Sequence, residues 1–230
     1  MAWYCSGSTN TELVENLFKA GLVKNDRVKE AMLGPTMPPS RPYSDSPQPI
    51  GHGATISAPH MHGHACEYLI DYLQPGARVL DIGSGSGYLT HVIANLVANP
   101  SNEGLVIGVD HIPALVELSR NNMNKSPKAV GCKTRASQVY CCRWSIRMER
   151  RGPLRRHPRR SSCREASPGA SRATTCPGRL FIPVESEEHD TASLGSGQWI
   201  WIVDKKADGS VHKEKVFQVS YVPLTDAPRS

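Results

Sequence analysis

Two aspartates and a run of glycines are spaced as in a ligand-binding loop. Asp81 follows a short apolar run and leads into Gly83-x-Gly85-x-Gly87, which we call the glycine loop (residues 83–87). Glycines let the backbone turn tightly and approach a ligand closely. Asp110 ends the next apolar run along the chain. An acid at that position can accept hydrogen bonds from both hydroxyl groups of a ribose.

The spacing of the glycine loop differs from the G-x-G-x-x-G pattern of dinucleotide sites. The negative charge of Asp81 disfavours a pyrophosphate and favours a cation, or an amine together with a ribose. S-adenosyl-L-methionine fits this description, since it has a positive centre, an ammonium group and a ribose, but no phosphate. A plain strand-to-helix turn and a dinucleotide site are the alternatives that the residues leave open.

Helices and strands must alternate to position these residues. Apolar periodicity and capping residues predict five helices, at 11–22, 26–33, 59–74, 87–97 and 113–123. Apolar runs predict strands at 78–82, 104–109, 179–184, 198–204 and 216–222, with a turn at 206–210. Residues 34–53, rich in Pro, Gly and Ser, are expected to form a loop. The alternation predicts an α/β fold with a doubly wound, mostly parallel sheet.

The size and composition of the chain fit one globular domain. We expect a single domain over 1–230, with N-terminal helices and a substrate loop in 1–76, a cofactor-binding half in 77–130 and C-terminal strands in 177–226. No apolar run reaches the length of a membrane span, and residues 1–13 lack the pattern of a secretory signal. Seven cysteines without a C-x-x-C pair favour a reducing compartment, so we expect a cytosolic protein.

The charge of the chain is concentrated in one segment. Residues 131–179 hold 13 of the 27 Lys and Arg residues and 2 of the 21 acids, a net charge of +11. Residues 131–178 also show no sustained apolar period, although a doubly wound fold should place two apolar strands there. Such a segment could bind nucleic acid.

Several separated motifs resemble one enzyme family. The glycine loop with Asp81 resembles motif I of class I S-adenosylmethionine-dependent methyltransferases, whose fold is Rossmann-like. The substrate loop (Gly53–His62, GATISAPHMH) resembles that of the protein-L-isoaspartate (D-aspartate) O-methyltransferases, and the runs GVDHIPALVELS (108–119) and VSYVPLTD (219–226) fit the same family. The resemblance covers roughly 1–130 and 178–226. It implies a cytosolic, monomeric repair enzyme that methylates isoaspartyl and D-aspartyl carboxylates in damaged proteins, with no metal and no membrane.

The resemblance also assigns roles to individual residues. Ser57 matches the active-site serine, and Asp110 matches the ribose-binding acid. For His62, a cofactor contact and a partly buried, hydrogen-bonded histidine are both open. Together with Asp81 and the glycine loop, the expected cofactor-binding residues are Ala54, Thr55, Ile56, Ser57, His62, Asp81, Gly83, Gly85, Ser86, Gly87, Asp110 and Thr225.

The expected reaction requires few catalytic groups. A carboxylate is already ionised at neutral pH, so no general base is required. A carboxylate and a sulfonium neutralise each other during the displacement, so positioning in a dry cleft should supply most of the rate. We therefore expect Ser57 to orient a carboxylate oxygen by hydrogen bonding and not to act as a nucleophile. His60 and His62 have no evident third partner, so we expect no metal site.

The segment 131–176 departs from the family pattern. Our hypothesis is that it was translated in a shifted reading frame, which is restored before Pro177; a genuine basic insert and an exon substitution are the alternatives. Without the missing strands the chain should bind S-adenosylmethionine poorly and be unstable. The competing functional hypothesis is an inactive methyltransferase-like protein whose basic segment binds nucleic acid.

Overall fold

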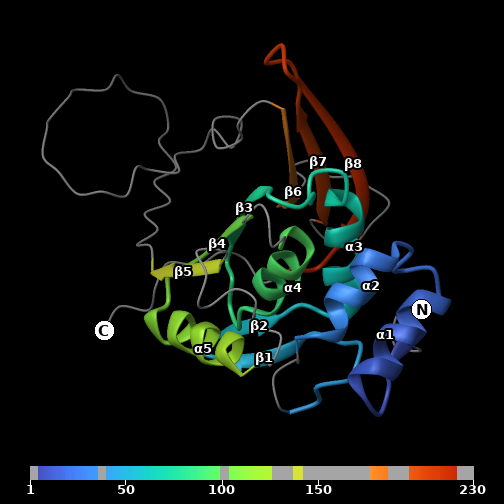
Figure 1. The fold of residues 1–230 in the computed structure, drawn as a ribbon, viewed down its shortest axis with the longest axis vertical. Coiled ribbons are helices and arrows are strands. Elements are labelled where there is room, and N and C mark those ends of the chain that lie inside the picture. Colours follow the sequence, from blue (N-terminus) through green and yellow to red (C-terminus); the bar gives the residue numbers. More distant parts are fainter. Residues whose placement is uncertain are drawn as a thin grey trace, which may run out of the picture.

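A computed structural model describes residues 5–35, 40–98, 104–125, 137–141, 177–185 and 197–221. The chain begins with two amphipathic helices, α1 (Asn10–Lys19) and α2 (Asp26–Leu33). A short antiparallel hairpin of β1 (Gln48–Gly51) and β2 (Ala54–Ile56) follows and leads into α3 (Pro59–Leu69). Figure 1 shows α2 beside both α1 and α4.

The next elements form a parallel sheet with the strand order β3-β4-β5. Strand β3 (Arg78–Ile82) is joined to β4 (Leu105–Asp110) by α4 (Tyr88–Val97), and α5 (Pro113–Asn124) leads from β4 towards β5 (Ser137–Cys141). Helices α4 and α5 contact both the sheet and each other, so they cover the same face. The predicted alternation of helix and parallel strand is confirmed here.

The C-terminal strands form a second, antiparallel sheet. Strand β7 (Gln198–Lys205) lies between β6 (Gly178–Glu185) and β8 (Val211–Val219). The predicted turn between β7 and β8 is confirmed, since Gly209 has φ +84° and the Lys206 N–H donates to the Ser210 carbonyl at 2.9 Å. Within the described residues this sheet is separate from the parallel one.

Four details of the sequence-based expectation were wrong. The helix expected over 59–74 ends at Leu69, and β8 begins at Val211, where pairing with β7 orders residues whose side chains are exposed. The stretch 34–53, expected as loop, contains β1, which pairs with β2 in spite of Pro49. Residues 137–141, inside the segment expected to lack regular structure, form β5 because parallel backbone pairing with β4 requires no side-chain pattern.

The main core lies between the N-terminal helices and α4. The side chains of Leu13, Leu17, Met32, Leu73 and Val92 are fully buried. Removing this much apolar surface from water is the main favourable term in folding, at about 25 cal/mol per Å². The core therefore fixes α3 and α4, the two helices that begin at the candidate site.

Strand β3 has an incompletely covered surface. Within the described residues it pairs with β4 alone. Its Leu80 and Ile82 side chains are 46% and 41% exposed. In a doubly wound sheet the strand that precedes the glycine loop is normally central and covered on both faces. One side of β3 is therefore more open to water than this fold class requires.

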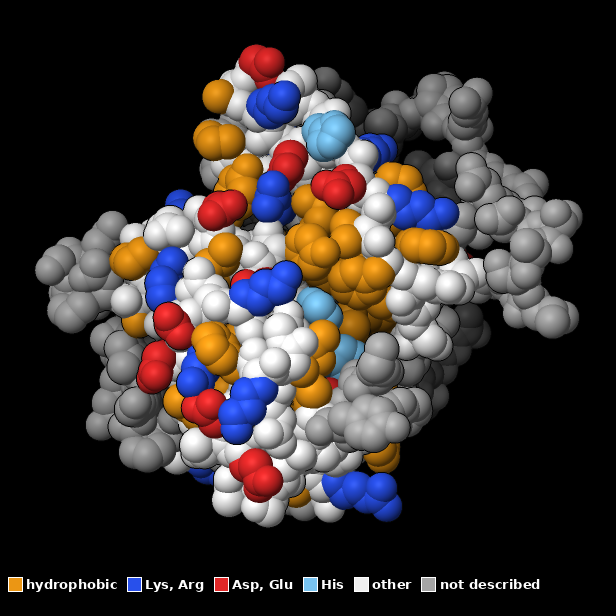
Figure 2. Space-filling model, turned by 90° about the vertical axis from the view of Figure 1, so that its right-hand side faces the viewer, with side chains coloured by type: hydrophobic (Ala, Val, Ile, Leu, Met, Phe, Trp, Pro, Cys, Tyr) orange, Lys and Arg blue, Asp and Glu red, His pale blue; other side chains and the backbone are white. Residues whose placement is uncertain are grey.

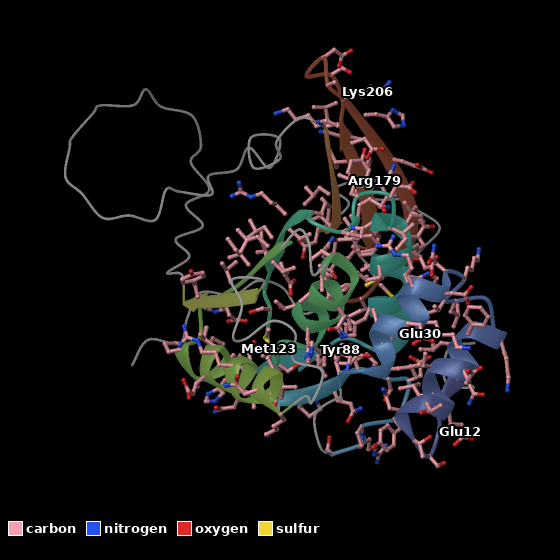
Figure 3. All side chains as sticks on the ribbon, viewed as in Figure 1. Glu12, Glu30, Tyr88, Met123, Arg179 and Lys206 are labelled. Carbon is pink, nitrogen blue, oxygen red and sulfur yellow. The ribbon has the colours of Figure 1, made fainter. Side chains whose placement is uncertain are left out.

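Arg179 of β6 joins the antiparallel sheet to α3. Its guanidinium donates two hydrogen bonds to the Asp204 carboxylate, at 2.7 and 2.8 Å, and a third to the backbone carbonyl of Tyr68 at 2.9 Å. Such paired bonds between a guanidinium and a carboxylate are directional and comparatively strong. Figure 3 labels Arg179 where β6 approaches α3.

Candidate active site

The glycine loop has the backbone conformation that its sequence predicts. Gly83, Gly85 and Gly87 have φ values of +80°, +51° and +81°, which residues other than glycine rarely adopt. The N–H groups of Gly83 and Ser84 donate to the carbonyl of Val109 at 2.8 and 3.0 Å. The loop is thus held against the end of β4, and its last glycine caps α4.

Asp110 is tied directly to the glycine loop. One carboxylate oxygen accepts a hydrogen bond from the Gly85 N–H at 2.9 Å, and the other accepts from the Ile112 N–H at 3.0 Å. The residue is only 4% exposed. Each oxygen of an ionised carboxylate has a second acceptor site, so both could also accept hydroxyl protons of a ligand. The structure brings together the loop and the second acid that the sequence suggested.

Asp81 is only partly exposed to solvent and contacts α4. It accepts a hydrogen bond from the Thr90 hydroxyl of α4 at 2.5 Å. Burial raises the pKa of its carboxyl group above the ordinary value and the nearby charge of Asp110 raises it further, while the hydrogen bond from Thr90 opposes both. The two acids are therefore close enough to affect each other electrostatically.

The β1–β2 hairpin and the end of the substrate loop contact the glycine loop and the start of α4. A Cβ atom added at Gly85 would lie 3.2 Å from the Cδ1 atom of Ile50 in β1. The rings of His62 and Tyr88 have centroids 5.0 Å apart, and Tyr88 is the residue that follows Gly87. Figure 3 labels Tyr88 at the start of α4. A residue of β1 thus lies against the glycine loop, and the last residue of the substrate loop lies against the start of α4.

His62 is held as a neutral imidazole. It is buried, and one ring N–H donates to the backbone carbonyl of Ser57. Burial lowers the pKa of His62 to about 4, because a charged ring would lose its hydration. The Nε2 atom has no hydrogen-bond partner within the described residues.

The structure also reveals two contacts that the sequence did not predict. Burial raises the pKa of the Tyr221 phenol and the Ser57 side chain lowers it, so these two side chains lie near one another. The ring Nδ1 of His60 lies 2.9 Å from a carboxylate oxygen of Asp45, which also accepts the His60 backbone N–H. These partners come from distant parts of the chain, and no local pattern marks them. Tyr221 stands in the run 219–226 that resembles the family.

The remaining expected site residues are distributed around this arrangement. Thr55 is exposed, Ala54 and Ser57 are half-buried, and Ile56 is buried. The backbone carbonyl of Ser86 accepts a hydrogen bond from the Asn122 side chain at 3.1 Å. Thr225 lies outside the described residues, as do 131–136 and 142–176 of the basic segment.

Several buried polar atoms near the glycine loop lack a protein partner. Within the described residues these are the Ser84 hydroxyl, the Tyr88 hydroxyl and His62 Nε2. A buried polar group without a partner is costly, so such atoms often mark the place of a ligand or water. Together with the Asp110 carboxylate, they provide hydrogen-bonding groups of both kinds beside a loop with close backbone access. This set fits a polar ligand that carries a ribose.

Metal ligands do not gather in the part of the chain that the structure describes. No group of three or more His, Cys, Asp or Glu side chains there could hold a metal ion. Among the same residues, none of the helices has the length and apolar character needed to cross a bilayer.

A strand leading into a glycine loop, a helix that starts at the loop and an acid at the end of the neighbouring parallel strand define the cofactor half of a Rossmann-like class I methyltransferase. Comparison with known proteins identifies the family. Residues 8–140 match the family model of protein-L-isoaspartate (D-aspartate) O-methyltransferases. The chain is 37% identical to the enzyme of that name from Caenorhabditis elegans, over 98% of this chain and 96% of the relative.

A wheat (Triticum aestivum) protein-L-isoaspartate O-methyltransferase is also 37% identical, over 94% of this chain and 91% of its own length. Among solved structures, a protein described as a putative Plasmodium falciparum member of the family, in complex with S-adenosyl-L-homocysteine, superposes with a TM-score of 0.77 and 27% identity. The superposition covers 95% of this chain and 99% of the Plasmodium falciparum chain. The chain therefore belongs to the protein-L-isoaspartate (D-aspartate) O-methyltransferase family.

The comparisons favour an S-adenosylmethionine-dependent protein carboxyl methyltransferase over a nucleic-acid-binding protein. The match to the family model also continues past residue 130, where the resemblance was expected to stop, and ends at Tyr140 in β5.

Proposed function

We propose that this chain transfers a methyl group from S-adenosylmethionine to the carboxylate of L-isoaspartyl and D-aspartyl residues in damaged proteins, with Ser57 as the residue that orients the acceptor. The glycine loop and Asp110 form the cofactor side of the proposed site. The substrate loop forms the acceptor side.

The packing of β1 on the glycine loop and of the end of the substrate loop on the start of α4 is the observation that carries the proposal. Ile50 packs at Gly85, and the His62 ring packs at Tyr88. Methyl transfer requires donor and acceptor to be held together in line, and this packing places the substrate loop beside the start of α4, next to the glycine loop. The bound cofactor would supply the methyl group on a sulfonium, and the acceptor carboxylate would displace a neutral thioether.

The residues of the chain would act by binding and orientation. The Ser57 hydroxyl would donate a hydrogen bond to one oxygen of the acceptor carboxylate and leave the other oxygen free to react. Asp110 would accept hydrogen bonds from the ribose hydroxyls of the cofactor. The neutral state of His62 avoids a second cation beside a positively charged donor. Ala54, Thr55, Ile56, Gly83, Ser86 and Thr225 are proposed as further cofactor contacts.

We further propose that the enzyme works as a cytosolic monomer. All residues assigned to the proposed site come from one chain, and none of the assigned roles requires a partner subunit. Sedimentation at the concentration of the activity assay would test the monomeric state. A monomeric enzyme should also keep the same specific activity on dilution.

The function can be tested with a matched pair of peptides. The purified chain is incubated with methyl-labelled S-adenosylmethionine and either an isoaspartyl peptide or its normal aspartyl twin. We expect base-labile methyl ester on the isoaspartyl peptide alone. Ester formation on both peptides, or on neither, would contradict the proposal. The Ser57→Ala variant should reduce transfer by a larger factor than it reduces cofactor affinity, measured by calorimetry.

A further inference from the structure

A row of rings runs from the substrate loop along α3 to the antiparallel sheet. His60, His64 and Tyr68 are four residues apart, so their side chains lie on one face of the helix. The ring centroids of His60 and His64 are 6.3 Å apart, in an edge-to-face arrangement. The Phe217 ring of β8 is 5.4 Å from His64 and 6.2 Å from Tyr68, and the Phe181 ring of β6 is 6.1 Å from Tyr68. We call these five residues the ring row.

The first ring of the row is held in a fixed orientation. A carboxylate oxygen of Asp45 accepts the His60 backbone N–H at 2.9 Å and lies 2.9 Å from the Nδ1 atom of the His60 ring. The Asp45 side chain is fully buried, whereas the His60 side chain is 21% exposed. His60 comes three residues after Ser57. The ring row therefore starts at the substrate loop with an anchored ring and leads away from that loop along the helix.

The rings of the row are partly open to solvent. All five side chains are half-buried, unlike the fully buried Leu73 of the core. Figure 2 shows a hydrophobic area with histidines at its edge on the side of the molecule where α3 meets β8. Burial lowers the pKa of His64, and the nearby His60 and Lys24 lower it further, so this ring is neutral at pH 7. The ring row thus presents an apolar surface with little charge of its own.

The length of the row matches a short stretch of polypeptide. The substrates of this family are proteins, so the acceptor carboxylate arrives with chain on both sides of it. A helix rises about 12 Å over the eight residues that separate His60 from Tyr68. An extended chain advances about 3.5 Å per residue. Three or four residues next to the isoaspartyl residue would therefore span the row.

We propose that the ring row binds an apolar side chain of the substrate polypeptide, within about four residues of the isoaspartyl residue and on one side of it. This inference rests on the proposed function and deepens it, because it assigns part of the choice among damaged proteins to α3 and the antiparallel sheet. Continuity with the substrate loop selects this occupant: a chain held at Ser57 must leave across the adjoining surface, and His60 places the row there. Rings attract other rings in edge-to-face and offset contacts, so an aromatic side chain fits best.

A series of peptides tests the preference. Each peptide carries one isoaspartyl residue in a Gly/Ser background, with phenylalanine or serine at one of the four positions on either side. We expect phenylalanine to raise kcat/KM about fivefold over serine at one or more positions on one side, a typical size for an aromatic contact. Equal kcat/KM values across the series would overturn the inference.

Removing one ring should remove the preference. In Phe217→Ala the ratio of kcat/KM for the phenylalanine and serine peptides should fall below about twofold. Both values come from one preparation, so a loss of folded enzyme cancels in the ratio. Trp199→Ala is the matched control: Trp199 pairs with Gln218, the neighbour of Phe217, so its ring lies on the other face of the same sheet. This control should keep the preference for phenylalanine.

A second variant separates docking from packing of α3 on the sheet. His64→Ser removes a ring from the helix instead of the sheet, and should also bring the ratio below about twofold. If the rings only pack the helix on the sheet, both variants lower kcat/KM for all peptides equally and the ratio stays unchanged, which would overturn the inference. Methyl transfer without any preference would leave the proposed function standing, whereas absence of transfer to every peptide would overturn both.

Discussion

The carboxylate of Asp110 accepts a hydrogen bond from the backbone N–H of Gly85 across 2.9 Å, which joins the end of one strand to the middle of the glycine loop. The same carboxylate also accepts the N–H of Ile112 at the entrance to α5. One side chain therefore holds the loop, the end of β4 and the start of α5 in place. The residue assigned to bind the ribose is also a structural residue.

Asp110→Asn should lower the stability of the protein as well as its affinity for the cofactor. An amide offers a single acceptor oxygen, so either Gly85 or Ile112 loses its partner. Hydrogen bonds to a charged group contribute about 1.5–3 kcal/mol, and we expect the free energy of unfolding in urea to fall by about 2 kcal/mol. Asp71→Asn, at an exposed position, is the control and should change it by less than about 0.5 kcal/mol. Equal stability of the two variants would contradict this role.

A methyl group at Gly87 should be more damaging than one at Gly209. Both residues have φ near +80°, so alanine is strained at either position by about 1 kcal/mol. A Cβ at Gly209 meets nothing within 4 Å, whereas one at Gly87 would lie 2.3 Å from Ser119 Oγ. We expect Gly87→Ala to lower the melting temperature clearly more than Gly209→Ala, and Ser119→Gly to restore part of the difference. Similar melting temperatures for the two alanine variants would refute the steric account.

His62 should make the protein less stable in mild acid. The folded protein keeps this ring neutral, whereas the unfolded chain protonates it as the pH falls through 6.5. Below that pH the unfolded state binds more protons, so stability is lost until the pH approaches 4, by an amount that reaches about 3 kcal/mol at 1.36 kcal/mol per pKa unit.

The free energy of unfolding at about pH 7 and about pH 4.5 would measure the effect of His62. His62→Gln should lose less stability between these two values than the unmodified chain. His212→Gln, at an exposed position, should behave like the unmodified chain. If His62→Gln shows the full loss, other groups carry the acid sensitivity.

The open side of β3 should limit both stability and solubility. An uncovered apolar strand is a site for unwanted pairing between chains. Replacing Leu80 and Ile82 by threonine should reduce light scattering on heating.

Substituting residues 142–176 by the corresponding residues of the wheat relative should raise the free energy of unfolding and the affinity for S-adenosylmethionine. If that exchange improves neither quantity, the basic segment is not the weakness of this chain. A nucleotide sequence whose shifted frame encodes no apolar strands would separately exclude the reading-frame hypothesis.

Much of the fold could be predicted because local chemistry determined it. The apolar runs at β3 and β4, the periodic helices around them and Asp208-Gly209 each carry a strong local signal. The hairpin of β1 and β2 was missed because Pro, Gly and Ser dominate its sequence. Strand β5 was missed because it is five residues long and depends on β4 for its order.

The candidate site also contains residues that the sequence predicted and contacts that it could not predict. The glycine loop and Asp110 follow from spacing, since both lie at the ends of adjacent parallel strands. Ser57 and His62 came from resemblance, and the structure adds their contact with each other. The proximity of Tyr221 to Ser57 could not be predicted from the sequence. Tyr221 follows β8, and the strands of that sheet lie more than a hundred residues after the substrate loop.

The bonds of Arg179 indicate how the acceptor side is supported. Its guanidinium ties β6 to Asp204 of β7 and to the carbonyl of Tyr68, near the end of the helix that begins just after Ser57. Ring contacts of His64 and Tyr68 with Phe217 add to this junction, and Figure 2 shows a continuous hydrophobic area with histidines at its border below the β7–β8 hairpin. Early and late parts of the chain are thus fastened to one another independently of the parallel strands. A lesion confined to the intervening sequence would leave every one of these fastenings in place.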